Sequence, residues 1–272
     1  MSDFDHAIST LDLSLFAHIE SQSTDHDRRS LLACQLAIRT LRDDYVYLEI
    51  GSHLGGSLQP YVRDPLCRRI FSIDKRPLSQ PDERGVDFAY EGNSTARMID
   101  GLRRIAPEGL EKLTCIDADA SAVAADRIDP KPDLCFIDGE HTDHAATSDF
   151  DFCRRVINPD GAIVFHDASI VYRALARIVR RLEDEGVRFT AYHLADSVFV
   201  IELGDCPLHG TPAIARMLVQ NHVGYLASLE ANDHYRAFAT QPLFQFLRSI
   251  KRTVLGLGSA RSTARDSARR SD

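Results

Sequence analysis

The stretch that decides the fold runs from Asp133 to Ser169 and reads DLCFIDGEHTDHAATSDFDFCRRVINPDGAIVFHDAS. It contains two short apolar runs, LCFI and AIVF, each followed by aspartate within two residues. Between these runs, the segment 142–157 has the edges of a helix and is followed by Pro159. A strand, a helix and a strand in this order predict a parallel βαβ unit, with Asp138 and Asp167 at one edge of the sheet.

The same alternation continues on both sides of this stretch. Strand-like runs before it read YVYLEIG, RIFSID and LTCID, and two runs after it read RFTAYHL and DSVFVIEL. The last two are separated only by Ala195, which predicts an antiparallel pair at the end of the sheet. Strands that alternate with helices and finish in a hairpin predict an α/β fold with a mostly parallel sheet and helices on both faces.

The regions outside this α/β core have a different pattern of apolar and polar residues. Residues 1–44 predict a helical N-terminal extension, and the core takes residues 45–204. Residues 205–250 predict a helical C-terminal extension whose aromatic side chains could cover the sheet or form a homodimer contact. Residues 251–272 are rich in Ser, Ala and Arg, and we expect a disordered basic tail.

Composition limits the partners of the chain. The 272 residues carry a net charge of −8, so no overall cationic field exists to hold nucleic acid or an anionic membrane. The six cysteines include no CxxC pair, which favours reduced thiols over a zinc site or a disulfide framework. The acidic N-terminus lacks the features of a signal peptide, and no apolar run reaches the length of a membrane span. We therefore expect a cytoplasmic protein.

The first motif with chemical meaning is YLEIGSHLGGS. A buried strand containing Glu49 turns through Gly51, Gly55 and Gly56 and leads into a helix that begins near Ser57. Such a turn brings backbone N–H groups to the carboxyl edge of the sheet, where ligands of open α/β folds bind. Its spacing is GxxxGG and differs from the GxGxxG of dinucleotide sites. Taken alone, the motif also fits a purely structural turn.

Two further strand ends strengthen the case for a nucleoside ligand. Asp74 ends the next strand, 25 residues after Glu49, where an acid can accept both ribose hydroxyls. The strand within LTCIDADAS ends near Asp117, and Asp119 follows it at a position suited to the exocyclic amine of an adenine. An exposed turn residue is the alternative for each of these acids.

The pair Asp138 and Asp167 predicts a cation site. Hard oxygen ligands that converge at neighbouring strand ends suit Mg²⁺ or Ca²⁺. A further ligand could come from His166, His141 or Glu140, which would admit softer metals. Strand-end aspartates also occur without a metal, but the polar run from Asp138 onward is difficult to explain as a turn alone.

On these motifs the sequence resembles the class I S-adenosylmethionine-dependent methyltransferases, within them the macrocin-type group of sugar and natural-product O-methyltransferases. The resemblance covers roughly residues 45–203, and its most diagnostic part is IDGEH combined with PDGAIVFHD. EIGSHLGGS corresponds to the methionine end of the cofactor, Asp74 to the ribose and DADAS to the adenine. The resemblance implies a Rossmann-like, seven-stranded sheet with S-adenosylmethionine along its carboxyl edge.

The resemblance also implies a set of site residues. The expected cofactor contacts are Glu49, Gly51, Ser52, Ser57, Asp74, Asp119, Ala120, Asp138 and His141. The expected divalent metal, Mg²⁺, is held by Asp138 and Asp167. Many metal-dependent relatives have an acid or an amide where this chain has Ala168, so the third ligand would be His166 or water.

Methyl transfer from a sulfonium needs alignment and an activated acceptor. We expect a metal to lower the pKa of an acceptor hydroxyl and a histidine to take its proton. His141 and His144 are spaced i, i+3, which would give them one face of a first helical turn, and we favour His144 as the base, with His141 and Asp138 completing the catalytic set.

The expected function is transfer of a methyl group to a hydroxyl of a sugar or glycoside, with a small molecule or an oligosaccharide such as a mannoside as acceptor. Two neighbouring hydroxyls chelate a metal equally well in a catechol, so a natural-product phenol methyltransferase is an alternative. A non-catalytic cofactor-binding protein of the same fold is another. The glycine spacing argues against a nicotinamide enzyme.

Overall fold

The computed structural model describes residues 2–85 and 87–219, together with positions 222, 226, 240–243, 245–247 and 250. The chain divides into two compact units, Met1–Tyr225 and Leu226–Asp272, and all elements discussed below belong to the first. After the core, residues 212–219 are helical. The tail predicted for residues 251–272, and much of the helical extension predicted for 205–250, lie outside the described residues.

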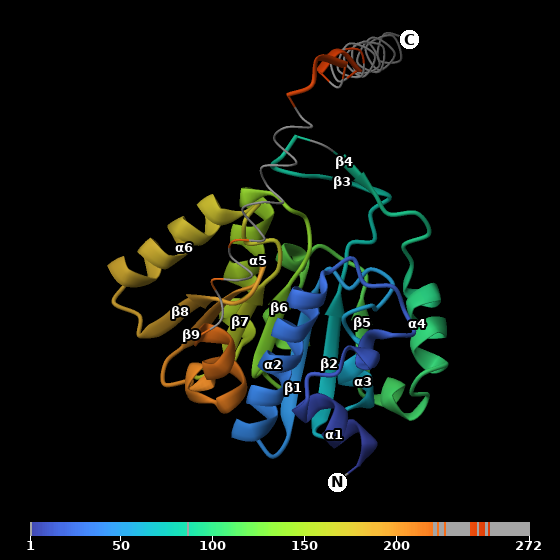
Figure 1. The fold of residues 1–272 in the computed structure, drawn as a ribbon, viewed down its shortest axis with the longest axis vertical. Coiled ribbons are helices and arrows are strands. Elements are labelled where there is room, and N and C mark those ends of the chain that lie inside the picture. Colours follow the sequence, from blue (N-terminus) through green and yellow to red (C-terminus); the bar gives the residue numbers. More distant parts are fainter. Residues whose placement is uncertain are drawn as a thin grey trace, which may run out of the picture. The chain divides into compact units, whose positions relative to one another are not determined.

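The first unit is built on a seven-stranded sheet with the order β5-β2-β1-β6-β7-β9-β8 (Figure 1). The first five strands in this order are parallel, and β9 is antiparallel to both β7 and β8. The strands are β1 (Tyr45–Ile50), β2 (Cys67–Ile73), β5 (Leu113–Ile116), β6 (Leu134–Ile137), β7 (Ala162–Phe165), β8 (Phe189–His193) and β9 (Phe199–Leu203). The predicted Rossmann-like α/β fold with a terminal antiparallel hairpin is confirmed.

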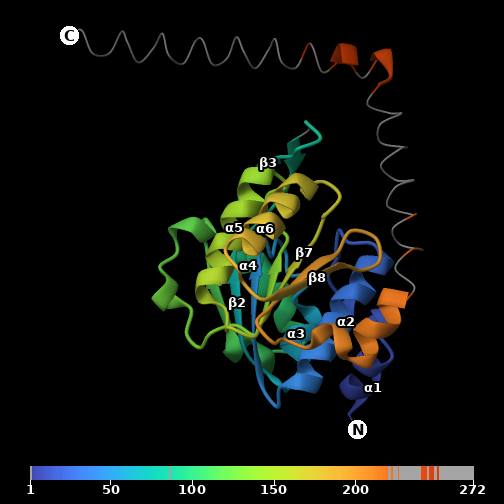
Figure 2. The same ribbon diagram turned by 90° about the vertical axis from the view of Figure 1, so that its left-hand side faces the viewer.

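Helices cover both faces of this sheet (Figures 1 and 2). They are α1 (Asp3–Ser9), α2 (Asp25–Leu41), α3 (Gln59–Arg63), α4 (Thr95–Arg103), α5 (Asp143–Val156) and α6 (Tyr172–Asp184). Side chains of α1 to α4 pack in one core cluster with Tyr45 and Tyr47, and those of α5 and α6 pack in a second with Val46 and Leu48. Side chains on the two faces of β1 thus pack into two cores, which is why this strand is apolar at every position except Glu49.

Short 3-10 turns complete the connections. They are η1 (Leu13–Phe16), η2 (Glu108–Lys112), η3 (Ala120–Ala122), η4 (Ala125–Arg127) and η5 (Leu208–Gly210). Between β5 and β6 the chain has only η3 and η4 in place of an α-helix. This leaves the carboxyl end of β5 covered by a short turn rather than by a helix.

A small antiparallel ribbon, β3 (Ser79–Pro81) and β4 (Asp87–Ala89), stands between β2 and α4. The sequence motifs did not predict it, because strands of three residues are too short to show a period of two. The ribbon is joined to the loop after β6, since Glu83 N donates to His141 O at 2.9 Å and Asp143 N donates to Glu83 Oε1 at 2.9 Å. It therefore lies at the carboxyl edge of the sheet.

Within the described part of the chain, no helix combines the length and apolar character needed to cross a lipid bilayer.

Candidate functional site

The turn after β1 determines how closely the strand ends approach one another. Gly51 has a φ of +94°, and a Cβ at this position would lie 2.0 Å from the carbonyl oxygen of Asp138. Only glycine accepts both the backbone conformation and the contact. The end of β1 therefore lies directly against the end of β6.

A cavity opens at this edge of the sheet. Its lining comes from the ends of β1, β2, β5 and β6 and from the first two turns of α5. Four residues predicted to bind the cofactor share this lining, namely Gly51, Asp74, Asp119 and Ala120. Lys75 and Glu140 also line it and form an ion pair with an N–O distance of 2.6 Å.

Asp74 lies at the end of β2, and its side chain is 5% exposed. Its Oδ2 accepts from His53 N at 2.8 Å and its Oδ1 accepts from Arg76 N at 2.7 Å. These bonds orient the carboxylate while it still lines the cavity. The placement is suited to accepting hydroxyl groups, as the sequence predicted for a ribose.

The other residues predicted from the glycine motif are buried and do not line this cavity. Glu49 is fully buried and accepts from the Tyr47 hydroxyl and from Ser57 Oγ, both at 2.7 Å. Burial raises the pKa of Glu49 to about 7, although both hydroxyl groups oppose the shift. Ser52 Oγ accepts from Ser72 Oγ at 2.8 Å. In this structure these side chains stabilise the turn after β1 at the carboxyl edge of the sheet.

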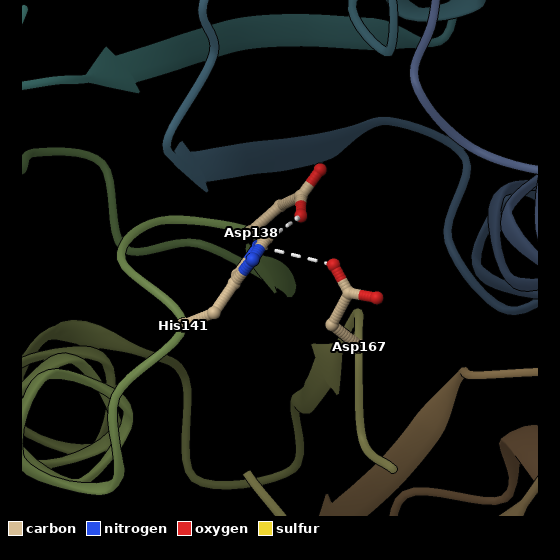
Figure 3. A group of neighbouring side chains, drawn as sticks. All are labelled: Asp138, His141 and Asp167. Atoms are coloured by element: carbon tan, nitrogen blue, oxygen red, sulfur yellow. Dashed lines mark ion pairs between the residues drawn. The ribbon is translucent and has the colours of Figure 1, made fainter. Parts of the chain in front are cut away.

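A second group of side chains, here called the Asp–His cluster, lies at the ends of β6 and β7. It consists of Asp138, His141, His166 and Asp167 (Figure 3 shows three of the four). His141 Nε2 lies 3.0 Å from Asp167 Oδ2 and 3.8 Å from Asp138 Oδ1. His166 Nδ1 lies 3.0 Å from Asp138 Oδ1 and 3.2 Å from Asp167 Oδ2. The two carboxylates thus share two imidazoles.

The charges of this cluster depend on one another. Burial alone would raise the pKa of both carboxyl groups, but the neighbouring histidines hold the pKa of Asp138 and of Asp167 below the usual range. Burial would lower the pKa of His141, yet Asp138 and Asp82 raise it to about 10. The pKa of His166 is raised well above its usual value by Asp138 and Asp167, against the effect of burial. Protonated histidines therefore compensate the two acids in the ligand-free protein.

Asp167 also has an unusual backbone conformation. Its φ is +51°, a region that residues with a Cβ seldom occupy. Strained positions of this kind concentrate at functional sites, where the surrounding structure holds them in place. Here the strain turns the carboxylate toward His141 immediately after β7 ends.

Two buried acids outside the Asp–His cluster contact its histidines, and sequence analysis missed both. Asp82, in the β3–β4 turn, has its Oδ2 3.4 Å from His141 Nδ1 and accepts from Arg84 Nε at 2.8 Å. Asp27, in α2, has its Oδ2 3.3 Å from His166 Nε2. The only sequence signal for Asp27 was a T-x-x-D helix start, which predicts a capping box and no more.

The structure separates the two histidines that the sequence placed on one helical face. Helix α5 begins at Asp143 with Thr142 as its N-cap, so His141 lies before the helix, and the expected shared face is wrong. His141 points into the Asp–His cluster, whereas His144 lines the cavity with Asp119 and Ala120. The helix start, two residues later than the spacing assumed, explains the difference.

The expected third metal ligand was His166 or water, and the geometry also offers His141. One ligand atom each from Asp138, His141 and Asp167 lie within 4.8 Å of one another. His166 is more deeply buried, with 7% of its side chain exposed, and lies between the carboxylates and Asp27.

Comparisons with known proteins agree with this architecture. Residues 48–168 match a family model described as a methyltransferase domain. Uncharacterized protein R132 of Acanthamoeba polyphaga mimivirus is 25% identical over 126 residues, which is 46% of this chain. The match spans about half, 52%, of the length of that relative.

Solved structures include several methyltransferases of similar size. The calicheamicin methyltransferase CalS11 has 14% identity and a TM-score of 0.49, with 74% of this chain and 93% of that chain covered. Cofactor-bound Rv0187 from MTB has 14% identity and a TM-score of 0.49, with 73% and 90% covered. The O-methyltransferase TomG from Streptomyces achromogenes, in complex with SAM, has 14% identity and a TM-score of 0.45, with 75% and 90% covered.

The strand order and the family match lead to one conclusion. The chain has a Rossmann-like α/β fold, and its residues 48–168 are similar to a methyltransferase domain.

Proposed function

We propose that the protein is an S-adenosylmethionine-dependent O-methyltransferase that acts on a hydroxyl of a sugar or glycoside, with a divalent metal in the Asp–His cluster. The observation that carries the proposal is the convergence of Asp138, His141 and Asp167 beside the cavity. Gly139 and Glu140 line the cavity directly after Asp138, so cofactor and acceptor sites would adjoin.

The donor set fits a divalent cation. Two carboxylates and one imidazole are ligands that Mg²⁺, Mn²⁺ or Fe²⁺ can accept, and the carboxylates favour Mg²⁺. Two positive imidazoles already balance the acids, so loss of one proton from each would let a divalent cation take their place without change in net charge. When bound, the metal would lower the pKa of an acceptor hydroxyl and fix its position.

The cavity would hold the cofactor. Asp74 is oriented to accept from ribose hydroxyls, and Asp119 and Ala120 form a wall suited to the adenine. Gly51 lines the cavity at the β1 turn, where the cofactor would meet the backbone. Because the methyl group is already activated on sulfur, the chain has to hold donor and acceptor in line and exclude water.

The base remains a histidine in this proposal, and the structure gives its two candidates different surroundings. His141 adjoins the carboxylates, where the acceptor would meet the metal. His144, the base predicted from the sequence, lines the cavity on the Asp119 side. The pair His141→Gln and His144→Gln separates these roles. A base loses turnover while S-adenosylhomocysteine binds normally, whereas a cofactor contact loses affinity.

The test is calorimetric titration with S-adenosylhomocysteine, followed by methyl transfer to a panel of glycosides and catechols with Mg²⁺ and with EDTA. We expect micromolar cofactor binding and glycoside turnover that EDTA abolishes and Mg²⁺ restores. Turnover of catechols alone would assign the protein to phenol methylation. Turnover that is insensitive to EDTA would contradict the metal, and absence of cofactor binding would contradict the proposal as a whole.

A further inference from the structure

One buried acid of the cavity has no role in the proposal so far. Asp149, in the second turn of α5, is 7% exposed and lines the cavity. Its side chain makes no hydrogen bond or ion pair with any residue that the structure describes. A buried carboxyl that lines a cavity without a protein partner is available to a ligand.

The surroundings of Asp149 favour its neutral form. Transfer of an unpaired carboxylate away from water is costly, and the protonated acid avoids that cost. Burial raises its pKa to about 7, and Asp119 and Glu140 contribute in the same direction against Lys75. Lys75 is in turn paired with Glu140 at 2.6 Å, which weakens its effect.

The turn after β5 contributes a different kind of group to the same cavity. Asp119 is the N-cap of η3, and its Oδ1 accepts from Ser121 N at 3.0 Å and from Ser121 Oγ at 2.6 Å. These bonds favour the ionised carboxylate, and they lower the pKa of Asp119. One wall therefore offers an acceptor, and Asp149 on α5 offers an O–H donor.

A flat heterocycle with both an amine and ring nitrogens complements these two walls. Ala120 and Ala145 supply small apolar surfaces in the same lining. An adenine presents a donor and acceptors along adjoining edges of one ring system. We propose that Asp149 is a specificity-determining contact for the adenine of the cofactor, to which it donates a hydrogen bond as a neutral carboxylic acid. This inference rests on the proposed function, since it takes S-adenosylmethionine as the ligand.

The inference makes cofactor affinity depend on pH. Because only the neutral acid donates, affinity is full below pH 7 and falls as the pH rises through the pKa of Asp149. Between pH 6 and pH 8.5 the wild-type affinity for S-adenosylhomocysteine should fall by about ten- to thirtyfold. The charged or titratable groups that face Asp149 are Asp119, Lys75, Glu140 and, on its own helix, His144.

The experiment is calorimetric titration with S-adenosylhomocysteine at pH 6 and pH 8.5 for the wild type and three variants. Asp149→Asn keeps a neutral donor at both pH values, so its affinity should change by less than about threefold. His144→Asn should keep the wild-type pH dependence. Asp151→Asn is the matched control, because Asp151 lies on the same helix and pairs with Arg181 outside the cavity lining.

The outcomes distinguish failure of the role of Asp149 from failure of the proposed function. Equal pH dependence in the wild type and in Asp149→Asn, or loss of it in His144→Asn, would overturn the role of Asp149 while leaving the methyltransferase proposal intact. Failure of the wild type to bind S-adenosylhomocysteine at either pH would overturn the proposed function and this inference together. Melting temperatures of each variant at both pH values show whether a loss of affinity comes from unfolding.

Discussion

The cavity and the Asp–His cluster adjoin at Gly139 and Asp138, yet a buried aspartate has different surroundings in the two regions. In the cluster, Asp138 and Asp167 are paired with histidines and remain ionised. In the cavity, Asp149 is buried without such a partner, and its pKa rises. Under the proposed roles, the same residue type would serve a cation in one region and a hydrogen-bonding ligand in the other.

The difference has a simple physical origin. Both regions are at the carboxyl edge of the same sheet, so burial acts on the acids of both. What differs is the supply of compensating charge, since His141 and His166 pair with Asp138 and Asp167, whereas Asp149 has no ion pair with any described residue. If the two regions divide the work as proposed, single substitutions should affect cofactor binding or turnover, and not both.

The largest effect should come from the cluster. Asp167→Asn removes a negative ligand, and we expect turnover with Mg²⁺ to fall at least about a hundredfold while affinity for S-adenosylhomocysteine changes less than about threefold. The exposed Asp205, which pairs with Arg188, provides the control Asp205→Asn with unchanged turnover. A parallel loss of cofactor affinity in Asp167→Asn would show that the two regions are one site.

The close contact between Gly51 and the Asp138 carbonyl should contribute to the stability of the fold. Gly51→Ala puts a Cβ against the Asp138 carbonyl at a φ of +94°, and we expect the free energy of unfolding to fall by about 3 kcal/mol. Gly186→Ala is the matched control, because Gly186 has a φ of +64° but nothing within 4 Å of the added Cβ, so it should cost about 1 kcal/mol. Urea denaturation measures both, and equal losses would remove the close approach as the cause.

Substitutions in the cavity should lower cofactor affinity more than turnover, the reverse of the effect expected in the cluster. Asp74→Asn replaces an acceptor for the ribose hydroxyls with an amide, and we expect affinity for S-adenosylhomocysteine to fall about tenfold. Turnover at saturating cofactor should remain within about threefold. Calorimetry and initial rates give the two numbers, with Asp100→Asn at an exposed ion pair as the control. A loss of turnover at saturation larger than the loss of affinity would contradict the division of roles.

The smallest effect should come from Glu49. Its pKa in the folded protein, about 7, lies above the ordinary value of 4.5, so the wild type loses stability as the pH rises between these two values. Glu49→Gln removes this loss and should raise the free energy of unfolding by about 1 kcal/mol at pH 6 relative to its effect at pH 5. Melting curves at the two pH values measure the difference. The same change at both would mean that Glu49 is not neutralised by folding.

Features that depend on short stretches of sequence were predictable. The seven strands follow from apolar runs, and Asp138 and Asp167 follow from their position after two of those runs. The turn after β1 follows from its glycines. Each of these properties is encoded within a few residues of the feature itself.

Features that depend on distant contacts were not predictable. Asp27 meets His166 across 139 positions of sequence, and nothing near Asp27 distinguishes it from a helix cap. Asp82 reaches His141 from a ribbon too short to leave a pattern. Asp149 looks like any polar residue of an amphipathic helix until its burial is known. The direction in which the His144 side chain points depends on where α5 begins. Helix boundaries vary by one or two residues, so the sequence did not determine this direction.

The bond network of Asp27 sets a limit on how this protein can be divided. Its Oδ1 accepts from Ser197 N at 2.9 Å, and Thr24 Oγ1 donates to its Oδ2 at 2.9 Å, so α2 is joined to the β8–β9 turn as well as to His166. A fragment beginning at residue 45 would contain all seven strands of the sheet but would lack the acid that backs a histidine of the cluster. A fragment that keeps the complete cluster must therefore include α2 as well as the sheet. Exchange of the N-terminal segment between relatives would change the acid that contacts His166.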